Sequence, residues 1–192
     1  MLDMGPYYIT ALVNLQGPVK RLCGMSKKSF DWRTITSQPK YGKKIEVEVA
    51  THCNGLLEFE NGAAASILTS FDVWRADHPR IEIFGTEGTL WVPDPNTFGG
   101  PVKLCRGTQE PLEMPLTHIY AENSRGIAVA DMAYALRSGR PVRASASLAY
   151  HVLDIMLGLE DSSQSGKFYD LPSTCERPAP LPMSPVHGYL DE

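Results

Sequence analysis

The sequence predicts an α+β fold, with a large, open and predominantly antiparallel β-sheet and helices packed on one of its faces. Three observations lead to this class. Apolar runs of strand length flank two tight turns, Glu60-Asn61-Gly62 and Gly85-Thr86-Glu87-Gly88, and Asn-Gly favours a hairpin because both residues tolerate positive φ. Helical patterns lie before and after this block of strands. Hairpins exclude a purely parallel sheet, and segregated helices are typical of the α+β class.

The first element is a helix predicted over residues 6–16. Pro6 suits the first helical turn, where its missing N–H is not needed, and Asp3 lies just ahead, where the helix dipole favours a carboxylate. An apolar stripe at helical spacing consists of Ile9, Leu12 and Val13. Gly17-Pro18 ends the helix.

Strands dominate the middle of the chain. A strand is predicted over 19–26, followed by a polar, irregular surface excursion over 27–44. Ile45, Val47 and Val49 alternate with glutamates, which predicts a half-buried strand. Further strands are predicted over 56–59, 63–71, 80–84, 89–92, 102–105 and 112–114.

Two helices and a short strand complete the predicted domain. Ser124 is expected to cap a helix that runs to about residue 138 and carries Val129, Met132, Ala133 and Leu136 at helical spacing. Ser145 is expected to cap a second, with Leu148, Val152, Ile155 and Leu159 on one face. Gly166 ends it, and residues 167–171 form a last strand. We expect one domain over 1–171 and a Pro-rich extended tail over 172–192.

One strand is apolar on both faces, which indicates that both faces of the sheet are covered. Ala63, Ala65 and Ile67 alternate with Ala64 and Leu68. The helices cover one face. The other face is a candidate surface for homo-oligomer formation.

Composition narrows the function classes. The 192 residues are 43% hydrophobic and 21% charged, with a formal net charge of −4, which gives no basic footprint for nucleic acid. No apolar run approaches the roughly 20 residues that span a membrane, and no secretory signal is recognised. The four cysteines form no CxxC pair, so we expect free thiols in a cytoplasmic protein and no metal site.

Motifs for a complete active site are missing from the sequence. There is no GxGxxG between a strand and a helix, and no P-loop, HExxH or GxSxG. From the residues alone, the chain is an α+β domain without a complete active site.

Several segments in order nevertheless resemble one family. The opening Asp3-Met4-Gly5-Pro6-Tyr7 is similar to the segment that begins the C-terminal domain of the Gfo/Idh/MocA oxidoreductases, the glucose-fructose oxidoreductase and inositol dehydrogenase family. Residues 55–74 resemble a strand pair of that domain, 80–90 resemble its IxGTEG hairpin, and 123–143 with 149–154 resemble its terminal helices and SGRPxxAS link. The resemblance extends from residue 2 to about residue 171.

The resemblance implies half of an enzyme. The family transfers hydride between a sugar, inositol or related polyol and NAD or NADP, and the cofactor belongs to a nucleotide-binding domain that we expect to be missing here. We therefore expect no cofactor bound by this chain alone. The family's catalytic lysine, in an EKP motif, also lies in that domain.

Two residues of the opening motif are the implied catalytic pair. The family motif often reads D-x-G-x-H-x-x-D, in which the first Asp or the His assists proton transfer. The first Asp maps to Asp3, the His to Tyr7 and the second acid to Thr10. A tyrosine is a poorer base than a histidine near neutral pH. Tyr7 either donates a hydrogen bond or acts as an acid, or else packs against and orients the substrate.

Four more residues are candidates for substrate binding. Trp74 and Tyr120 can stack on a sugar, with core or interface packing as the alternative; Asn123 and Arg125 can bind a polyol or carboxylate, with capping and solvation as the alternative. His151 and Asp154, three residues apart on a helix, are interpreted as a surface pair. A standalone binding or assembly module and a truncated fragment remain alternatives to the half-enzyme.

Overall fold

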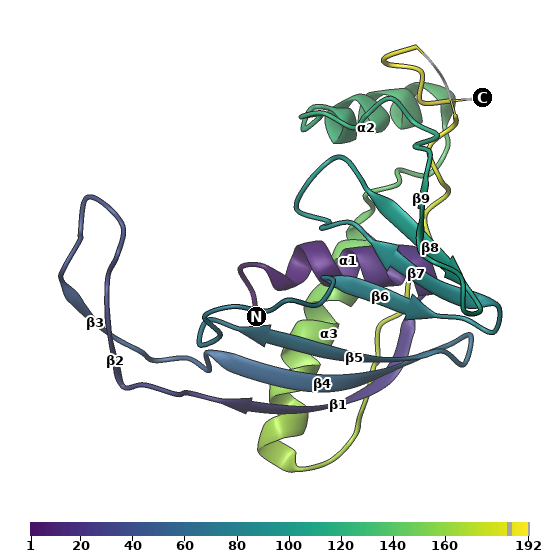
Figure 1. The fold of residues 1–192 in the computed structure, drawn as a ribbon. Helices are drawn as coiled ribbons and strands as arrows, with labels where there is room; N and C mark the ends of the chain where they lie inside the picture. Colours follow the sequence, from purple (N-terminus) through teal and green to yellow (C-terminus); the bar gives the residue numbers. More distant parts are fainter. Residues whose placement is uncertain (184–185, 192) are drawn as a thin grey trace. The chain divides into compact units, whose positions relative to one another are not determined.

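The computed structural model describes residues 1–183 and 186–191, and its contacts group the chain into two compact units. Unit 1 combines residues 1–75 with 146–177, and unit 2 combines 76–145 with 178–192. The α+β class with open antiparallel sheets is confirmed, and the strands are divided among three sheets (Figure 1). The predicted domain division at residue 171 stays a prediction.

Unit 1 is built on a four-stranded sheet, here sheet A, with strand order β10-β1-β4-β5. Its elements are α1 (Gly5–Gln16), β1 (Val19–Lys27), β4 (His52–Phe59), β5 (Ala64–Ser70), α3 (Ala146–Ser165) and β10 (Tyr169–Asp170). Every pairing in this sheet is antiparallel, and a tight turn at Asn61-Gly62 connects β4 to β5, as predicted.

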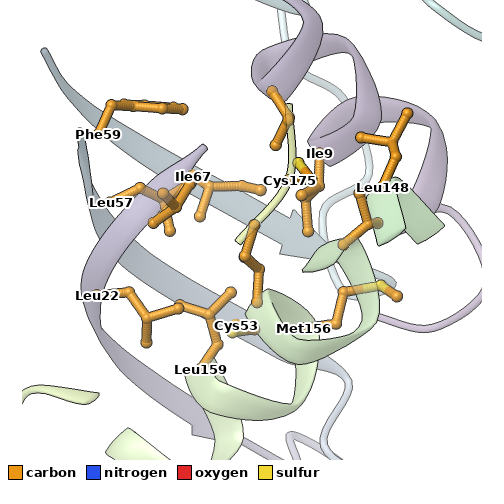
Figure 2. Close-up of a cluster of buried hydrophobic side chains, with 14 residues drawn as sticks. Ile9, Leu22, Cys53, Leu57, Phe59, Ile67, Leu148, Met156, Leu159 and Cys175 are labelled. Carbon is orange, nitrogen blue, oxygen red and sulfur yellow. The ribbon is translucent and has the colours of Figure 1, made fainter. Parts of the chain in front are cut away.

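The hydrophobic core of unit 1 lies between sheet A, α3 and α1. Figure 2 shows Leu22, Leu57 and Ile67 of the strands facing Leu159 of α3. Leu148, Val152, Ile155 and Leu159, the predicted stripe, are all buried in it.

Two paired glycines allow α3 to approach the sheet closely. Gly24 on β1 lies opposite Gly55 on β4. A Cβ atom on Gly24 would lie 2.5 Å from the carbonyl oxygen of Leu159, and one on Gly55 would lie 2.3 Å from its Cδ2. Both distances are far shorter than van der Waals contact, so a larger residue at Gly24 meets the backbone of α3, and one at Gly55 requires the Leu159 side chain to move.

The opposite face of sheet A, here called the outer face, is uncovered within unit 1. Met25, Leu56 and Leu68 point outward and are exposed, the two leucines at 56% each. Ile67, the neighbour of Leu68, is buried on the helix-covered face. Apolar side chains therefore lie on both faces of β5, as the sequence predicts, and those of the outer face are exposed beside polar residues such as Asn54 and Ser66.

Residues 28–51, here called the arm, lie between β1 and β4 and include β2 (Trp32–Thr34) and β3 (Lys44–Glu46). Figure 1 shows the arm leaving sheet A at the end opposite the β4–β5 turn. The half-buried strand predicted around Ile45, Val47 and Val49 is wrong in extent and burial. β3 is fully exposed and only Val47 is buried, because no second layer of unit 1 lies against this ladder.

Unit 2 contains a four-stranded meander and one helix. The strands are β6 (Ile81–Phe84), β7 (Gly88–Val92), β8 (Val102–Arg106) and β9 (Leu112–Met114), paired in that order, which confirms the second predicted hairpin. Helix α2 spans Ile127–Ser138.

The cap and the core face predicted for α2 are wrong. The Ser124 hydroxyl donates to the Glu122 carbonyl, and the N-cap is Gly126, without a side-chain cap. Val129 and Leu136 of the predicted stripe are 70% and 81% exposed, whereas Asp131 and Ala135 are buried. Helical spacing located the helix, but not the face that unit 2 covers.

The tail has no helix or strand among its described residues, yet it is anchored in both units. Ser173 and Cys175 are buried in unit 1 and Leu190 is buried in unit 2. The guanidinium of Arg143 donates to the carbonyls of Ala179, Pro180 and Leu190. The tail is therefore extended but packed along part of its length.

Candidate functional site

Asp3 and Tyr7, the predicted catalytic pair, flank the first turn of α1. The N-cap is Met4, with no side-chain cap, so Asp3 lies one residue outside the helix and is exposed. The buried face of α1 carries Gly5, Ile9 and Val13. Tyr7 falls on the other side of the helix and is 41% exposed. Both side chains are therefore available to a ligand at this end of the helix.

Gly5, the middle of the opening motif, has a structural role that the sequence did not reveal. A Cβ atom at Gly5 would lie 2.9 Å from the sulfur atoms of both Met1 and Met156. Met156 belongs to α3, so the glycine allows α1 to pack closely on α3. This packing fixes the start of α1, from which Asp3 and Tyr7 project.

The predicted substrate-binding residues belong to different units. Trp74, in unit 1, is fully exposed. Tyr120, Asn123 and Arg125 lie in unit 2, within six residues of one another. Asp3 and Tyr7 flank the first turn of α1, and Tyr120, Asn123 and Arg125 lie in one short segment of unit 2. The functional roles of all six stay predictions.

Two of the unit 2 candidates already contact the protein itself. The Tyr120 hydroxyl accepts a hydrogen bond from the Gly188 amide at 3.0 Å, and its ring meets His187 edge-on at 5.8 Å between centroids. The Arg125 guanidinium lies 5.9 Å from the centre of the Phe98 ring. Asn123 is exposed. Tyr120 and Arg125 thus have partners within unit 2.

Unit 2 also carries a shallow hollow of about 300 Å³ beside the β6–β7 hairpin. Its lining includes Glu87, Leu90 and Arg106, but none of the six predicted site residues. The hollow is open to solvent, and the charged side chains in its lining are those of Glu87 and Arg106.

His151 and Asp154 form a buried polar network, so their interpretation as a surface pair is wrong. His151 is 0% exposed and Asp154 is 9% exposed. Ser173 lies between them: its hydroxyl is 2.9 Å from His151 Nδ1 and donates to Asp154 Oδ2. Spacing within the helix could not reveal this burial, because the linking residue comes from the tail, about twenty positions later.

The network fixes the protonation of the imidazole. The Val19 amide donates to His151 Nε2 at 3.0 Å, so Nδ1 carries the proton and donates to Ser173. Tyr169 donates a further hydrogen bond to the Asp154 carboxylate. Burial lowers the pKa of His151 below its ordinary value near 6.5. Because each polar group has a partner and the imidazole is inaccessible, the network holds β1, α3 and the tail together and offers no open site.

A second buried network lies in the link that resembles SGRPxxAS. Asp131 of α2 accepts hydrogen bonds from the guanidinium groups of Arg140 and Arg143, and Arg140 also pairs with Asp191. Burial raises the pKa of the Asp131 carboxyl, but these hydrogen bonds outweigh burial and the net shift is downward. The two arginines of the link thus join α2 to the tail and are committed to structure.

Neither a metal centre nor a membrane segment is found within residues 1–183 and 186–191. No group of three or more His, Cys, Asp or Glu side chains is placed to hold a metal ion. No helix in that part of the chain is long and apolar enough to cross a bilayer. The cysteines are free, as predicted, and burial raises the pKa of the Cys53 and Cys175 thiols.

Comparison with solved structures places the fold among oxidoreductases. The chain is similar to aldose-aldose oxidoreductase from Caulobacter crescentus in complex with glycerol (TM-score 0.67, 18% identity, 88% of this chain and 46% of that one). It is similar to levoglucosan dehydrogenase in complex with NADH and L-sorbose (0.68, 18%, 89% and 50%). It is also similar to an oxidoreductase from Agrobacterium radiobacter in complex with NAD⁺, L-tartaric acid and magnesium (0.60, 16%, 88% and 48%). The chain spans about half the length of these proteins.

These likenesses show the fold alone: the chain folds like about half of each of these oxidoreductases. Residues 1–91 match the model of the GFO/IDH/MocA C-terminal domain, and this segment contains α1 and strands β1 to β6. No curated protein matches the chain in sequence. The family resemblance found in the sequence is thereby confirmed.

Proposed function

We propose that the chain is the substrate-binding and oligomerisation half of an NAD(P)-dependent oxidoreductase that acts on a sugar, inositol or related polyol. The observation that carries the proposal is the opening of α1, where the family match and the exposed Asp3 and Tyr7 coincide. The solved structures of the same fold that hold glycerol, L-sorbose or L-tartaric acid support a polyhydroxylated substrate. The free cysteines support a cytoplasmic location.

The start of α1 does not fit a site for the dinucleotide. A pyrophosphate is bound by free amides at a helix N-terminus that follows a strand through a Gly-rich turn. In α1, Pro6 has no N–H, and the amides of Gly5 and Tyr7 already donate to the carbonyls of Met1 and Met4. We therefore assign NAD or NADP to a nucleotide-binding domain that acts with this chain, and we expect the chain alone to bind neither.

Asp3 and Tyr7 are assigned to the reacting hydroxyl of the substrate. The carboxylate of Asp3 accepts a hydrogen bond from that hydroxyl, and Tyr7 donates or accepts a second one from its place four residues further on. The packing of Gly5 on Met156 holds both in position. Such positioned acid–base groups contribute about 10²–10⁴-fold in rate.

Steady-state kinetics on the chain joined to a nucleotide-binding domain of the family tests this assignment. We expect Asp3→Asn to lower kcat/KM by about 10²-fold, and Tyr7→Phe to lower it less, since the lysine of the other domain remains the main proton-transfer group. Asn14→Ala, at an exposed position near the other end of α1, is the control. Folded Asp3 and Tyr7 variants with unchanged kcat/KM would reduce both residues to structural roles.

A homo-oligomer formed through the outer face of sheet A is part of the proposal. Met25, Leu56 and Leu68 expose apolar surface there, and monomers seldom leave large contiguous apolar patches uncovered. The same face also supports the second candidate, a standalone binding or assembly module without chemistry of its own. Loss of kcat/KM in the Asp3 variant distinguishes the enzyme from the module.

A further inference from the structure

The end of β5, the start of α1 and the root of the arm lie at one end of sheet A (Figure 1). The Thr69 hydroxyl, near the end of β5, donates to the sulfur atom of Met1 at 3.8 Å, two residues before Asp3. Residues 71–75, here called the exit segment, therefore leave the sheet beside the predicted catalytic pair. Trp74 belongs to this segment, and its Cα atom lies within about 18 Å of that of Thr69, the reach of five extended residues.

One side chain of the exit segment is directed inward. Phe71 and Trp74 are exposed, whereas the side chain of Asp72 is only 11% exposed. Burying a carboxylate costs free energy unless charges and hydrogen bonds satisfy it. Hydrogen bonds from Ser29 and Thr51 lower the pKa of Asp72 more than burial raises it, so the group is ionised near neutral pH. Asp72 is thus a fixed point in a segment that otherwise exposes large apolar side chains.

The arm supplies the partners of this carboxylate. Thr51 donates to Asp72 Oδ2 at 2.7 Å, and Arg33 Nη1 lies 3.4 Å from Asp72 Oδ1. Both terminal nitrogens of Arg33 also donate to the Phe71 carbonyl, at 3.1 and 3.0 Å, and the Phe71 amide donates to the Thr51 carbonyl. These contacts, here called the clamp, fix the backbone of residue 71 and the side chain of residue 72.

Sheet A holds the exit segment from the other side. The Asp72 amide donates to Ser70 Oγ at 3.0 Å, and Ser70 Oγ lies 2.9 Å from Nδ1 of His52 on β4. The segment is therefore bound at two consecutive residues, and Trp74 follows two residues later. An exposed side chain on a fixed backbone is preorganised, so that less entropy is lost when it contacts a ligand.

We propose that Asp72 is a positioning residue of the substrate site: the clamp holds the exit segment so that the indole of Trp74 covers the C–H face of a sugar or polyol whose reacting hydroxyl lies at the start of α1. The flat, apolar face of an indole suits such a surface. The arm thus acts in substrate binding through its two clamp residues. The inference rests on the proposed function and adds to it what sets the position of Trp74.

Fluorescence of the full chain tests the clamp. The chain has three tryptophans, so W32F/W91F leaves Trp74 as the probe. In this background Thr51→Val removes the clamp hydroxyl but keeps the shape of the side chain, and the amplitude of the slow anisotropy decay should fall by about a third. Thr51→Ser, which keeps the hydroxyl, and Thr34→Val, at an exposed position of β2, should not change it. Equal decays for the two valine variants would overturn the clamp.

Steady-state kinetics on the chain joined to a nucleotide-binding domain tests the link to the substrate. We expect Thr51→Val to raise KM about fivefold with little change in kcat, because a contact made equally in the ground state and the transition state affects KM alone. The same change should add nothing in Trp74→Ala, since a positioning residue acts only through the side chain that it positions. An equal rise in KM with and without the indole refutes the positioning role.

The Asp3 variant separates this inference from the proposed function. If Asp3→Asn lowers kcat/KM while Trp74→Ala leaves KM unchanged, the substrate role of the exit segment is overturned and the proposed function stands. If neither variant changes the kinetics, the proposed function fails, and the role of the clamp in substrate binding fails with it. Circular dichroism confirms that each variant is folded.

Discussion

Removing the Ser173 hydroxyl tests the buried network most directly. This hydroxyl accepts a hydrogen bond from His151 Nδ1 and donates one to Asp154 Oδ2, while the Ser173 amide also donates to Asp154 at 3.2 Å. In Ser173→Ala the hydrogen bond from the backbone amide of residue 173 to Asp154 remains, but the imidazole N–H of His151 loses its acceptor inside a fully buried site. The carboxylate loses one of its donors.

The two losses set the expected magnitude. An unsatisfied buried donor costs about 1–3 kcal/mol, and a hydrogen bond to a charged group contributes about 1.5–3 kcal/mol. Because the Ser173 amide still serves Asp154, we expect the free energy of unfolding to fall by about 2–4 kcal/mol, near the sum of the lower values.

Urea denaturation followed by circular dichroism measures this change. With a slope of about 2 kcal/mol per molar urea, the midpoint should fall by about 1–2 M without a change in slope. Thr174→Ala, at the exposed neighbouring position, should stay within about 0.5 kcal/mol of wild type. Equal midpoints for the Ser173 and Thr174 variants would refute the reasoning that the network stabilises unit 1.

Two further predictions concern the same unit. Burial lowers the pKa of His151 in the folded state, so the unfolded chain takes up a proton on this imidazole at a higher pH than the folded chain does. The contribution of neutral His151 to the free energy of unfolding is therefore fully present above about pH 6.5. Below that pH it should fall, by at most about 1.4 kcal/mol per pH unit. Urea midpoints between pH 7.5 and 5 measure this fall. The profile should be flatter in His151→Gln and unchanged in His78→Gln, which is at an exposed position. A flat profile for the wild-type chain would contradict the prediction. Gly24→Ala should destabilise the chain by about 1–3 kcal/mol, because the new methyl group meets the Leu159 carbonyl. Thermal melts against exposed Ser66→Ala measure it, and equal melting temperatures would show that α3 accommodates the methyl group.

Local signals in the sequence were sufficient for most of the elements. The proline of the first helical turn and Gly17-Pro18 placed α1 to within one residue of its observed bounds, Gly5–Gln16. The Asn-Gly turn and the Gly85–Gly88 turn placed both hairpins. In each case the information lies within a few residues, because caps and tight turns depend on the conformation of single positions.

The misplaced features depend on residues far apart in the chain. His151 and Asp154 are buried because Val19 and Ser173, 132 positions before and 22 after His151, satisfy the imidazole. The apolar stripe of α2 with Val129 and Leu136 is exposed, because the helix buries Asp131 between two arginines of the following link. Spacing in the sequence shows that a helix has two faces, but only the assembled partners decide which face is covered.

The candidate site was predicted in its position and not in its surroundings. The opening motif located Asp3 and Tyr7 at the start of a helix, where the structure has them. The contact between Gly5 and Met156 of α3 joins residues about 150 positions apart and left no local signal. For the same reason, the contacts of Tyr120 with Gly188 and of Arg125 with Phe98 left no local signal.

The pairing of β10 with β1 has a consequence for how the protein is made. Strand β1 pairs with β4 early in the chain, but α3 and β10 come only after all of the unit 2 strands. During synthesis, the side chains of Leu22, Leu57 and Ile67 therefore remain uncovered by α3 until the ribosome has passed residue 165. Closing so long a loop is slow, since its entropy is lost before the distant contacts form. The nascent chain thus depends on α3 to bury the core side chains of β1, β4 and β5.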